Sequence, residues 1–236
     1  MKPSILLKII LLLLIIISSN YTSFSDSLSN PNWKITFLGN ASFYIKTEEK
    51  KFFFDFPYKS GAFGYAKYSK DQLQIPDSNS LLFFTHSHAD HYSRKFVKKL
   101  YQKVYGPKNL LLFYPKKRKV DLFSDLGNEI KIDCFNSKHN LAINHLTYLL
   151  KIKNIKVLIT GDTENTKILK KIGQVEILVT TPWLLLKIIN EGLINDYKLI
   201  FLTHIKPGQK IINKLPNKVI IPEISASFAF SGIEII

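Results

Sequence analysis

The segment LLFFTHSHADHYSRKF, residues 81–96, places an apolar run directly before a polar cluster. Leu81 to Phe84 has the composition of a buried strand, and residues 93–104 are typical of a helix. Between them stand three of the six histidines in the chain and one aspartate: His86, His88, Asp90 and His91. So many imidazole and carboxylate groups at the end of a core strand indicate a functional site and not ordinary packing.

The spacing within this cluster indicates a metal site. Residues two apart in an extended or looped backbone point to the same side, so His86 and His88 can approach one ion together. Asp90 and His91 begin the turn into the helix and face elsewhere. Imidazole nitrogens and carboxylate oxygens bind zinc and related divalent ions, and a catalytic zinc needs three protein ligands. Four candidates in one motif are therefore enough to begin two sites.

Composition sets the broad class of the chain. With 236 residues, 46% of them hydrophobic and 22% charged, it can bury a core and is not disordered. The net charge of +15 would suit a polyanionic partner or an anionic membrane surface. The lysines are nevertheless spread along the chain as on a solvated surface, and the one dense run, residues 116–119, is expected to cap a surface loop. We therefore expect no nucleic-acid partner. The single cysteine, Cys134, excludes an intramolecular disulfide.

Residues 1–25 are predicted to be a secretory signal peptide and not part of the fold. Lys2 and Lys8 form a positive start, Ile9 to Ile17 is a run of nine Ile and Leu, and small serines are spaced for cleavage before Asp26. A spanning helix needs about 20 apolar residues, so a retained membrane anchor is the alternative. The sequence thus predicts an exported protein, periplasmic or extracellular, or else one that is anchored at its N-terminus.

The rest of the chain is strand-rich from Trp33 onward. WKITFLG, SFYIKT and KKFFFDF predict an antiparallel meander, followed by a long loop at residues 59–79. Further strands are predicted at 81–85, 110–114, 129–136, 145–152, 154–162, 175–181 and 197–204, near KVYG, and at KVIIP and SFAF, with helices at 93–104 and 163–172. No repeat or Pro-rich linker divides this pattern, so we predict one domain, residues 31–236. Its fold class is α+β, a layered αβ/βα sandwich of two packed mixed β-sheets flanked by helices.

Four of the predicted strands end in a residue of the metal-binding type. These residues are His86, His139, Asp162 and His204. Such a recurrence is unlikely by chance, and it suggests that the four side chains meet at one edge of the fold.

Several segments together resemble the metallo-β-lactamase superfamily. THSHADH is similar to its His-x-His-x-Asp-His signature, KVLITGDTE to its Gly-Asp-Thr segment, and FNSKHN and LIFLTHIKP to its later histidine segments. The resemblance covers residues 33–207 and is nearest to the small single-domain, lactonase-like or phospholipase-like branch. One departure is visible: Gly39-Asn40-Ala41 stands where these branches carry Gly-His-Ala, so that histidine is absent.

The resemblance implies a role for each polar residue. It assigns His86, His88 and His139 to a first metal, Asp90, His91 and His204 to a second, and Asp162 to a bridge between them. His145 competes with His139 for the third position of the first site. Asp55 would support the ligands by hydrogen bonds or simply form a turn. The implied cofactor is a pair of divalent ions, with Zn²⁺ preferred and Mn²⁺ or Fe²⁺ as alternatives.

The implied reaction is hydrolysis by a metal-bound hydroxide, which Asp90 and Asp162 would orient. The substrate would be an ester, a lactone or a phosphodiester. It would be a small or lipid-like molecule, and the basic balance favours an anionic one; transient contact with a membrane surface is compatible with this. Tyr65 in the long loop and Trp183 are expected near the site. The first alternative is a catalytically idle metal-binding envelope protein, and the second is a basic nucleic-acid or membrane-surface protein with incidental histidines.

Overall fold

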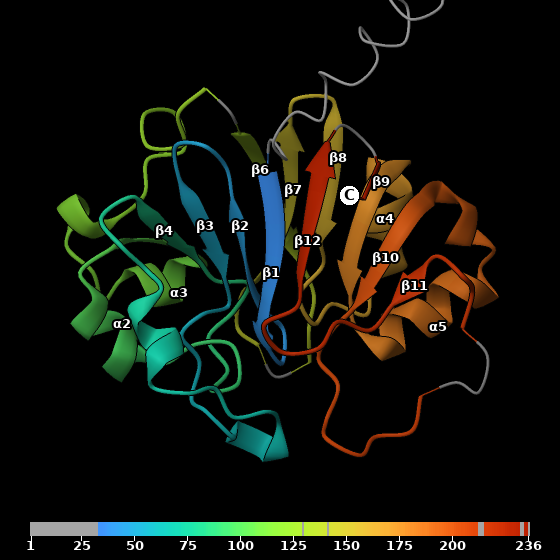
Figure 1. Ribbon diagram of the computed structural model, residues 1–236, viewed down its shortest axis with the longest axis horizontal. Coiled ribbons are helices and arrows are strands. Elements are labelled where there is room, and N and C mark those ends of the chain that lie inside the picture. Colours follow the sequence, from blue (N-terminus) through green and yellow to red (C-terminus); the bar gives the residue numbers. More distant parts are fainter. Residues whose placement is uncertain (1–32, 129, 141, 212–214, 232–233, 236) are drawn as a thin grey trace, which may run out of the picture.

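The computed structural model describes residues 33–128, 130–140, 142–211, 215–231 and 234–235, which form two β-sheets packed face to face (Figure 1). Within these residues, one sheet has seven strands in the order β13-β12-β1-β2-β3-β4-β5, and the other has six in the order β11-β10-β9-β8-β7-β6. This architecture confirms the predicted α+β sandwich. The predicted signal peptide, residues 1–25, lies outside the described residues.

The elements of the two sheets have the following bounds. The seven-stranded sheet contains β1 (Trp33–Gly39), β2 (Ser42–Lys46), β3 (Lys51–Phe54), β4 (Ser80–Phe83), β5 (Lys103–Tyr105), β12 (Ser227–Ser231) and β13 (Glu234–Ile235). The six-stranded sheet contains β6 (Ile130–Ser137), β7 (His145–Ile152), β8 (Ile155–Ile159), β9 (Val175–Thr180), β10 (Tyr197–Leu202) and β11 (Val219–Ile220). The helices are α2 (Arg94–Leu100), α3 (Lys108–Leu111), α4 (Thr166–Ile172) and α5 (Pro182–Asn190).

Both sheets are mixed, and each is antiparallel in one half and parallel in the other. In the first sheet β1, β2 and β3 pair antiparallel, while β4 and β5 run parallel to β3. In the second sheet β6, β7 and β8 pair antiparallel, while β9, β10 and β11 continue in parallel. Parallel neighbours deliver their carboxyl ends to the same edge of a sheet, and this is where the polar cluster lies.

The continuous apolar runs reflect burial on both faces of each sheet. Alternate side chains of a strand point to opposite faces, so Phe52 and Phe54 of β3 enter the core between the sheets. Phe53 points outward and packs in a separate cluster with Val97 of α2. Figure 1 shows α2 and α3 outside the first sheet and α4 and α5 outside the second. Because both faces are covered, the strands need not alternate apolar with polar residues.

Three details differ from the sequence-based prediction. The strand predicted at 110–114 is wrong, because this apolar run is the short helix α3 followed by a turn. The helix predicted to 104 ends at Leu100, since Tyr101 adopts a left-handed conformation with φ of 61° and the chain then enters β5. Helix α5 was not predicted, although Pro182 at its first turn is a common start signal.

No helix in the described part of the chain combines the length and the apolar composition that crossing a membrane requires.

Candidate metal centre

The loops that follow β4, β6, β8 and β10 converge at one edge of the sandwich. They bring together the seven predicted ligand residues in two groups, and within each group the candidate ligand atoms lie within 4.8 Å of one another. The first group is His86, His88 and His139; the second is Asp90, His91, Asp162 and His204. The geometry thus gathers all seven side chains, while their role as metal ligands stays a prediction.

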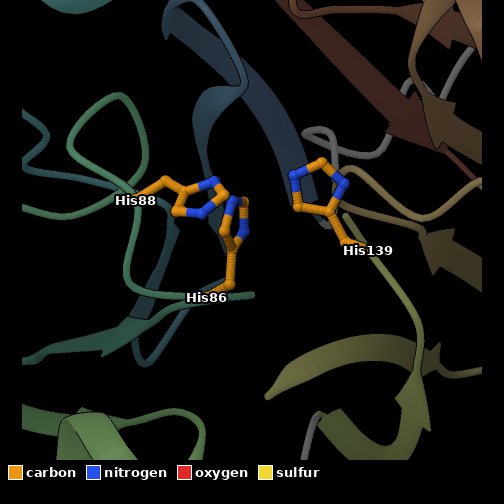
Figure 2. A group of neighbouring side chains, drawn as sticks. All are labelled: His86, His88 and His139. Carbon is orange, nitrogen blue, oxygen red and sulfur yellow. The ribbon is translucent and has the colours of Figure 1, made fainter. Parts of the chain in front are cut away.

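The first group is a set of three imidazoles (Figure 2). Figure 2 shows His86 and His88 side by side on the loop after β4, with His139 facing them from the loop after β6. The ring centroids of His86 lie 4.6 Å from those of His88 and 5.0 Å from those of His139. His86 is fully buried, whereas His88 and His139 are partly exposed, so this side of the centre is open to solvent.

The Asp162 carboxylate lies at the junction of the two groups. Its Oδ2 atom is 3.1 Å from Nε2 of His91 and 3.2 Å from Nε2 of His204. The same oxygen is 3.7 Å from Nε2 of His139 and 3.9 Å from Nε2 of His86, which belong to the first group. Asp90 completes the second group, with its Oδ2 atom 3.1 Å from Nε2 of His204. One carboxylate oxygen therefore faces histidines of both groups.

Four side-chain atoms of this cluster are buried and lack the partner that burial normally requires: within the described part of the chain these are Nδ1 of His139, Nδ1 of His204, Nε2 of His86 and Oδ1 of Asp162. Nε2 of His86 and Oδ1 of Asp162 are the two that bear on a metal. An unsatisfied buried polar group costs about 1–3 kcal/mol, so such atoms are rarely left unpaired without a reason. Both are lone-pair donors of the kind that zinc and related ions bind. The residues present therefore fit a divalent metal centre.

Asp55 orients one ligand of each group by hydrogen bonds on the side of the ring that faces away from the cluster. Its Oδ2 atom accepts a hydrogen bond from Nδ1 of His91 at 2.9 Å, which leaves Nε2 of that ring facing the cluster. The same oxygen accepts the hydroxyl proton of Thr85 at 2.8 Å. Because that proton is committed, the Thr85 oxygen must accept from Nδ1 of His86, 3.0 Å away, so Nε2 of His86 also faces the cluster. This favours a supporting role for Asp55, which also occupies a turn with φ of 50°.

Replacing Asp55 with asparagine should weaken metal binding about 10- to 100-fold. In Asp55, Oδ2 accepts from His91 and from the Thr85 hydroxyl while Oδ1 accepts the Thr85 backbone N–H, and an amide has an acceptor oxygen for only one of these two positions. Asparagine tolerates the left-handed backbone at this position, so the turn should survive. Competition with a chromophoric chelator measures the affinity, and Asp133→Asn on the exposed face of β6 is the control. Unchanged affinity in Asp55→Asn would reduce Asp55 to a turn residue.

The charges of the centre are strongly coupled. Burial alone would lower the pKa of His91, but the carboxylates of Asp162 and Asp55 outweigh it and raise that pKa well above its ordinary value. Burial would raise the pKa of Asp162, yet the charge of His91 and hydrogen bonds from His204 and His91 hold it well below its usual range. Burial and the charge of His91 hold the pKa of His86 well below its ordinary value. A bound cation would replace the proton on His91, because metal ligands must be deprotonated.

His145 is held in a different way from the other histidines. Its Nε2 atom accepts a hydrogen bond from the backbone N–H of Asp162 at 3.0 Å, and its Nδ1 donates to the hydroxyl of Ser137 at 2.7 Å. Burial lowers its pKa to about 3, so the ring is neutral, as the accepting nitrogen requires. Both nitrogens are therefore engaged, and the geometry favours His139 for the third position. Toward Asp162, His145 is therefore a hydrogen-bond acceptor beside the site.

Asn40 has a role that sequence reasoning missed. Its side-chain N–H donates to the backbone carbonyl of Asp90 at 2.7 Å, and its backbone carbonyl accepts a hydrogen bond from the backbone N–H of His204 at 3.1 Å. The residue has a φ of 52°, a conformation that asparagine adopts more readily than most residues. It therefore joins two ligand loops that are far apart in sequence. The visible signal was its place between a glycine and the second strand.

Two aromatic rings cover the side of the centre next to His204. The Tyr65 ring lies edge-on to the His204 ring with centroids 4.2 Å apart, and the Trp183 ring lies 5.0 Å away. Burial and the charges of Asp162 and Asp90 raise the pKa of Tyr65 to about 12, so it remains a phenol at neutral pH. The sequence placed both aromatics near the site, and the structure does so too.

A groove opens on each side of the centre. The groove beside His204 has a volume of about 500 Å³ and a mainly apolar lining that includes Phe37, Leu202, Ile205, Ile221, Pro222 and Ile224. The groove beside His139 has a volume of about 560 Å³ and is lined largely by polar groups, including Lys138, Asn140, Glu164 and Asn165. Both volumes lie within the range of ligand sites, about 300–1,000 Å³. The arrangement suits a molecule with one apolar and one polar end.

Comparison with known proteins supplies independent findings. The sequence model of a protein family described as beta-lactamase superfamily domain matches residues 34–186. Among curated proteins no match is found.

Solved structures share the fold at low sequence identity. A metallo hydrolase from the archaeon Ignicoccus hospitalis is 13% identical, with a TM-score of 0.65 over 85% of this chain and 99% of that one. An isothiocyanate hydrolase from Delia radicum gut bacteria is 16% identical, with a TM-score of 0.60 over 84% of this chain and all (100%) of that one. The short form of human tRNase Z is 15% identical, with a TM-score of 0.57 over 82% and 98% of the two chains. At these identities the likeness shows a shared fold.

Proposed function

Since the chain belongs to the beta-lactamase superfamily, we propose that it is a dinuclear metal-dependent hydrolase of esters, lactones or phosphodiesters. The observation that carries this proposal is the position of Asp162. Its Oδ2 atom lies 3.1–3.9 Å from Nε2 of four histidines, two in each ligand group. A carboxylate oxygen so placed can be shared by two cations, whereas an imidazole nitrogen serves one.

The chain offers a complete set of ligands for two ions. His86, His88 and His139 would hold the first ion, Asp90, His91 and His204 the second, and Asp162 would touch both. The predominance of imidazole favours zinc, with manganese or iron as alternatives. When bound, the ions would supply Lewis-acid polarisation of the scissile group and water that is acidic enough to act near neutral pH.

The protein groups around the ions would position the substrate and orient the attacking water. The carboxylates of Asp90 and Asp162 can accept hydrogen bonds from the attacking water and thereby aim it at the substrate. Tyr65 keeps its phenolic proton and lies against His204, so it can donate a hydrogen bond to substrate. Tyr65 and Trp183, which pack against His204, would also restrict access of bulk water to the second ligand group.

The two grooves support an asymmetric substrate. The apolar groove beside His204 would take an acyl or ring group, and the polar groove beside His139 would take the other end of the molecule. The excess of cationic residues supports an anionic or lipid-like substrate.

Metal dependence tests the proposal. Zinc should bind near two ions per chain and raise the melting temperature, because it binds the folded state. A chelator should abolish turnover of 4-nitrophenyl acetate, 4-nitrophenyl octanoate, a γ-lactone or bis(4-nitrophenyl) phosphate, and added zinc should restore it. The Asp133→Asn variant serves as the matched control. Two bound ions without turnover of any of these probes would favour the catalytically idle metal-binding protein, and no bound metal would refute both.

A further inference from the structure

A second surface of the molecule combines strong positive charge with exposed apolar side chains. Residues 94–119 contain ten Lys and Arg and no Asp or Glu, and we call the surface that they form the basic face. Seven of these cations are exposed: Arg94, Lys95, Lys98, Lys99, Lys108, Lys116 and Lys117. The segment supplies helices α2 and α3, which lie together outside the first sheet in Figure 1.

Side-chain contacts join the two ends of this segment into one surface. The guanidinium of Arg94, at the start of α2, lies 3.8 Å from the centre of the Phe113 ring. The guanidinium of Arg118 donates to the backbone carbonyls of Val97 at 3.2 Å and Gln102 at 2.7 Å. Helix α2 and the turn that carries residues 113–118 are thus side by side, and their charges act together.

Three large hydrophobic side chains of the basic face are exposed: Tyr101, which is 83% exposed, and the adjacent pair Leu112 and Phe113. Leu112 is 79% exposed and Phe113 is 50% exposed, although buried Leu110 and Tyr114 flank them. Lys116 and Lys117 follow within four residues. Water would solvate a purely basic surface without cost, but it gives no reason for adjacent Leu and Phe side chains to be exposed. The combination calls for a partner that is both anionic and apolar.

We propose that the basic face binds the surface of an anionic lipid bilayer. The cations would contact the headgroups, while Leu112 and Phe113 would enter the boundary with the acyl chains, as apolar residues of interfacial proteins do. Nucleic acid would satisfy the charge, but it offers no counterpart for Leu112. The face also adjoins the metal centre, because Asn109 of α3 donates to the hydroxyl of Ser87 at 3.4 Å, between His86 and His88.

The test measures binding to vesicles of phosphatidylcholine alone and of phosphatidylcholine with 30% phosphatidylglycerol. Residues 9–17 are an apolar run that would insert by itself, so the readout must be local: hydrogen exchange of peptides from residues 94–119 of the full-length protein. Protection is expected on the anionic vesicles and should disappear at high salt. A lysine near such a surface contributes about a fivefold change, so Lys116→Gln with Lys117→Gln should weaken anionic binding about 25-fold.

Matched variants distinguish binding by the basic face from a general effect of net charge or of exposed apolar side chains. Lys167→Gln with Lys171→Gln removes the same charge from two exposed positions of α4, which lies outside the other sheet. This pair should change binding less than twofold. Leu112→Ser should weaken binding about tenfold, whereas Leu186→Ser on α5 should not. Equal protection on both vesicle types, or equal losses in the two lysine pairs, would overturn the proposal. So would tight binding of a 20-nucleotide RNA that Leu112→Ser leaves unchanged while the lysine pair at 116 and 117 abolishes it.

Discussion

Replacing Asp162 with alanine is expected to lower hydrolysis by roughly a thousandfold or more and to reduce bound metal toward one ion per chain. The variant loses the oxygen that lies between the two ligand groups, so each of the proposed ions loses a ligand and the pair loses its shared anion. The second site, left with Asp90, His91 and His204, should empty first. The fold should persist, because the two sheets enclose an apolar core that does not contain these residues.

Metal stoichiometry, turnover and circular dichroism of the same purified preparation measure these effects. Asp162→Asn is the informative partner, since it keeps the shape of the side chain but removes the charge that two cations would share. His139→Ala should instead weaken the first site more than the second. If Asp162→Ala keeps two tightly held ions and normal turnover, the bridging role is wrong.

Replacing Gly161 with alanine is expected to destabilise the protein by about 3 kcal/mol, the sum of backbone strain and a steric clash. Gly161 has a φ of +55°, and an added Cβ would lie 2.7 Å from Nε2 of His145 and 2.8 Å from Cβ of Thr85. Neither neighbour can retreat freely. His145 is bonded to the N–H of Asp162, and Thr85 is bonded to Asp55. Metal affinity should therefore fall together with stability.

Gly192 provides the control for the strain alone. It has a φ of +71°, and nothing lies within 4 Å of an added Cβ, so Gly192→Ala should cost only about 1 kcal/mol. Denaturant unfolding of both variants gives the difference, which isolates the contact with His145 and Thr85. Equal costs for the two substitutions would show that the space around Gly161 is not restricted.

Local pattern accounts for most of the strands that the sequence predicted. The run at residues 145–152 was predicted with the bounds of β7, because turn-forming residues flank it, Asn144 before it and Lys153-Asn154 after it. The apolar run LLLFY was wrongly predicted as a strand at 110–114, since a short run of this kind fits either a buried strand or a short helix. The short strand predicted near KVYG is β5, but the helix predicted to 104 overlapped it, and pairing of residues 103–105 with β4 is what fixes the boundary between them.

The candidate site shows the same limit. Histidine and aspartate at strand ends identified which side chains could meet, because parallel strands end at a common edge. The hydrogen bonds that distinguish His139 from His145 depend on Ser137 and on the backbone of Asp162, which lie apart in sequence. The bond from Asn40 to the Asp90 loop spans 50 residues and depends on how two loops pack, so the place of Asn40 in the sequence could mark a turn but could not identify its partner.

The position of Asp55 has a consequence for how the centre is filled. A single carboxylate oxygen fixes His91 directly and His86 through Thr85, and these rings belong to different ligand groups. When a bound cation orders one of these rings, it also orders the Asp55 carboxylate, which holds the other ring in place. In the proposed centre the two ions would therefore bind with positive cooperativity, and by thermodynamic reciprocity each would raise the affinity for the other by the same factor. Partly loaded molecules should be scarce during a titration.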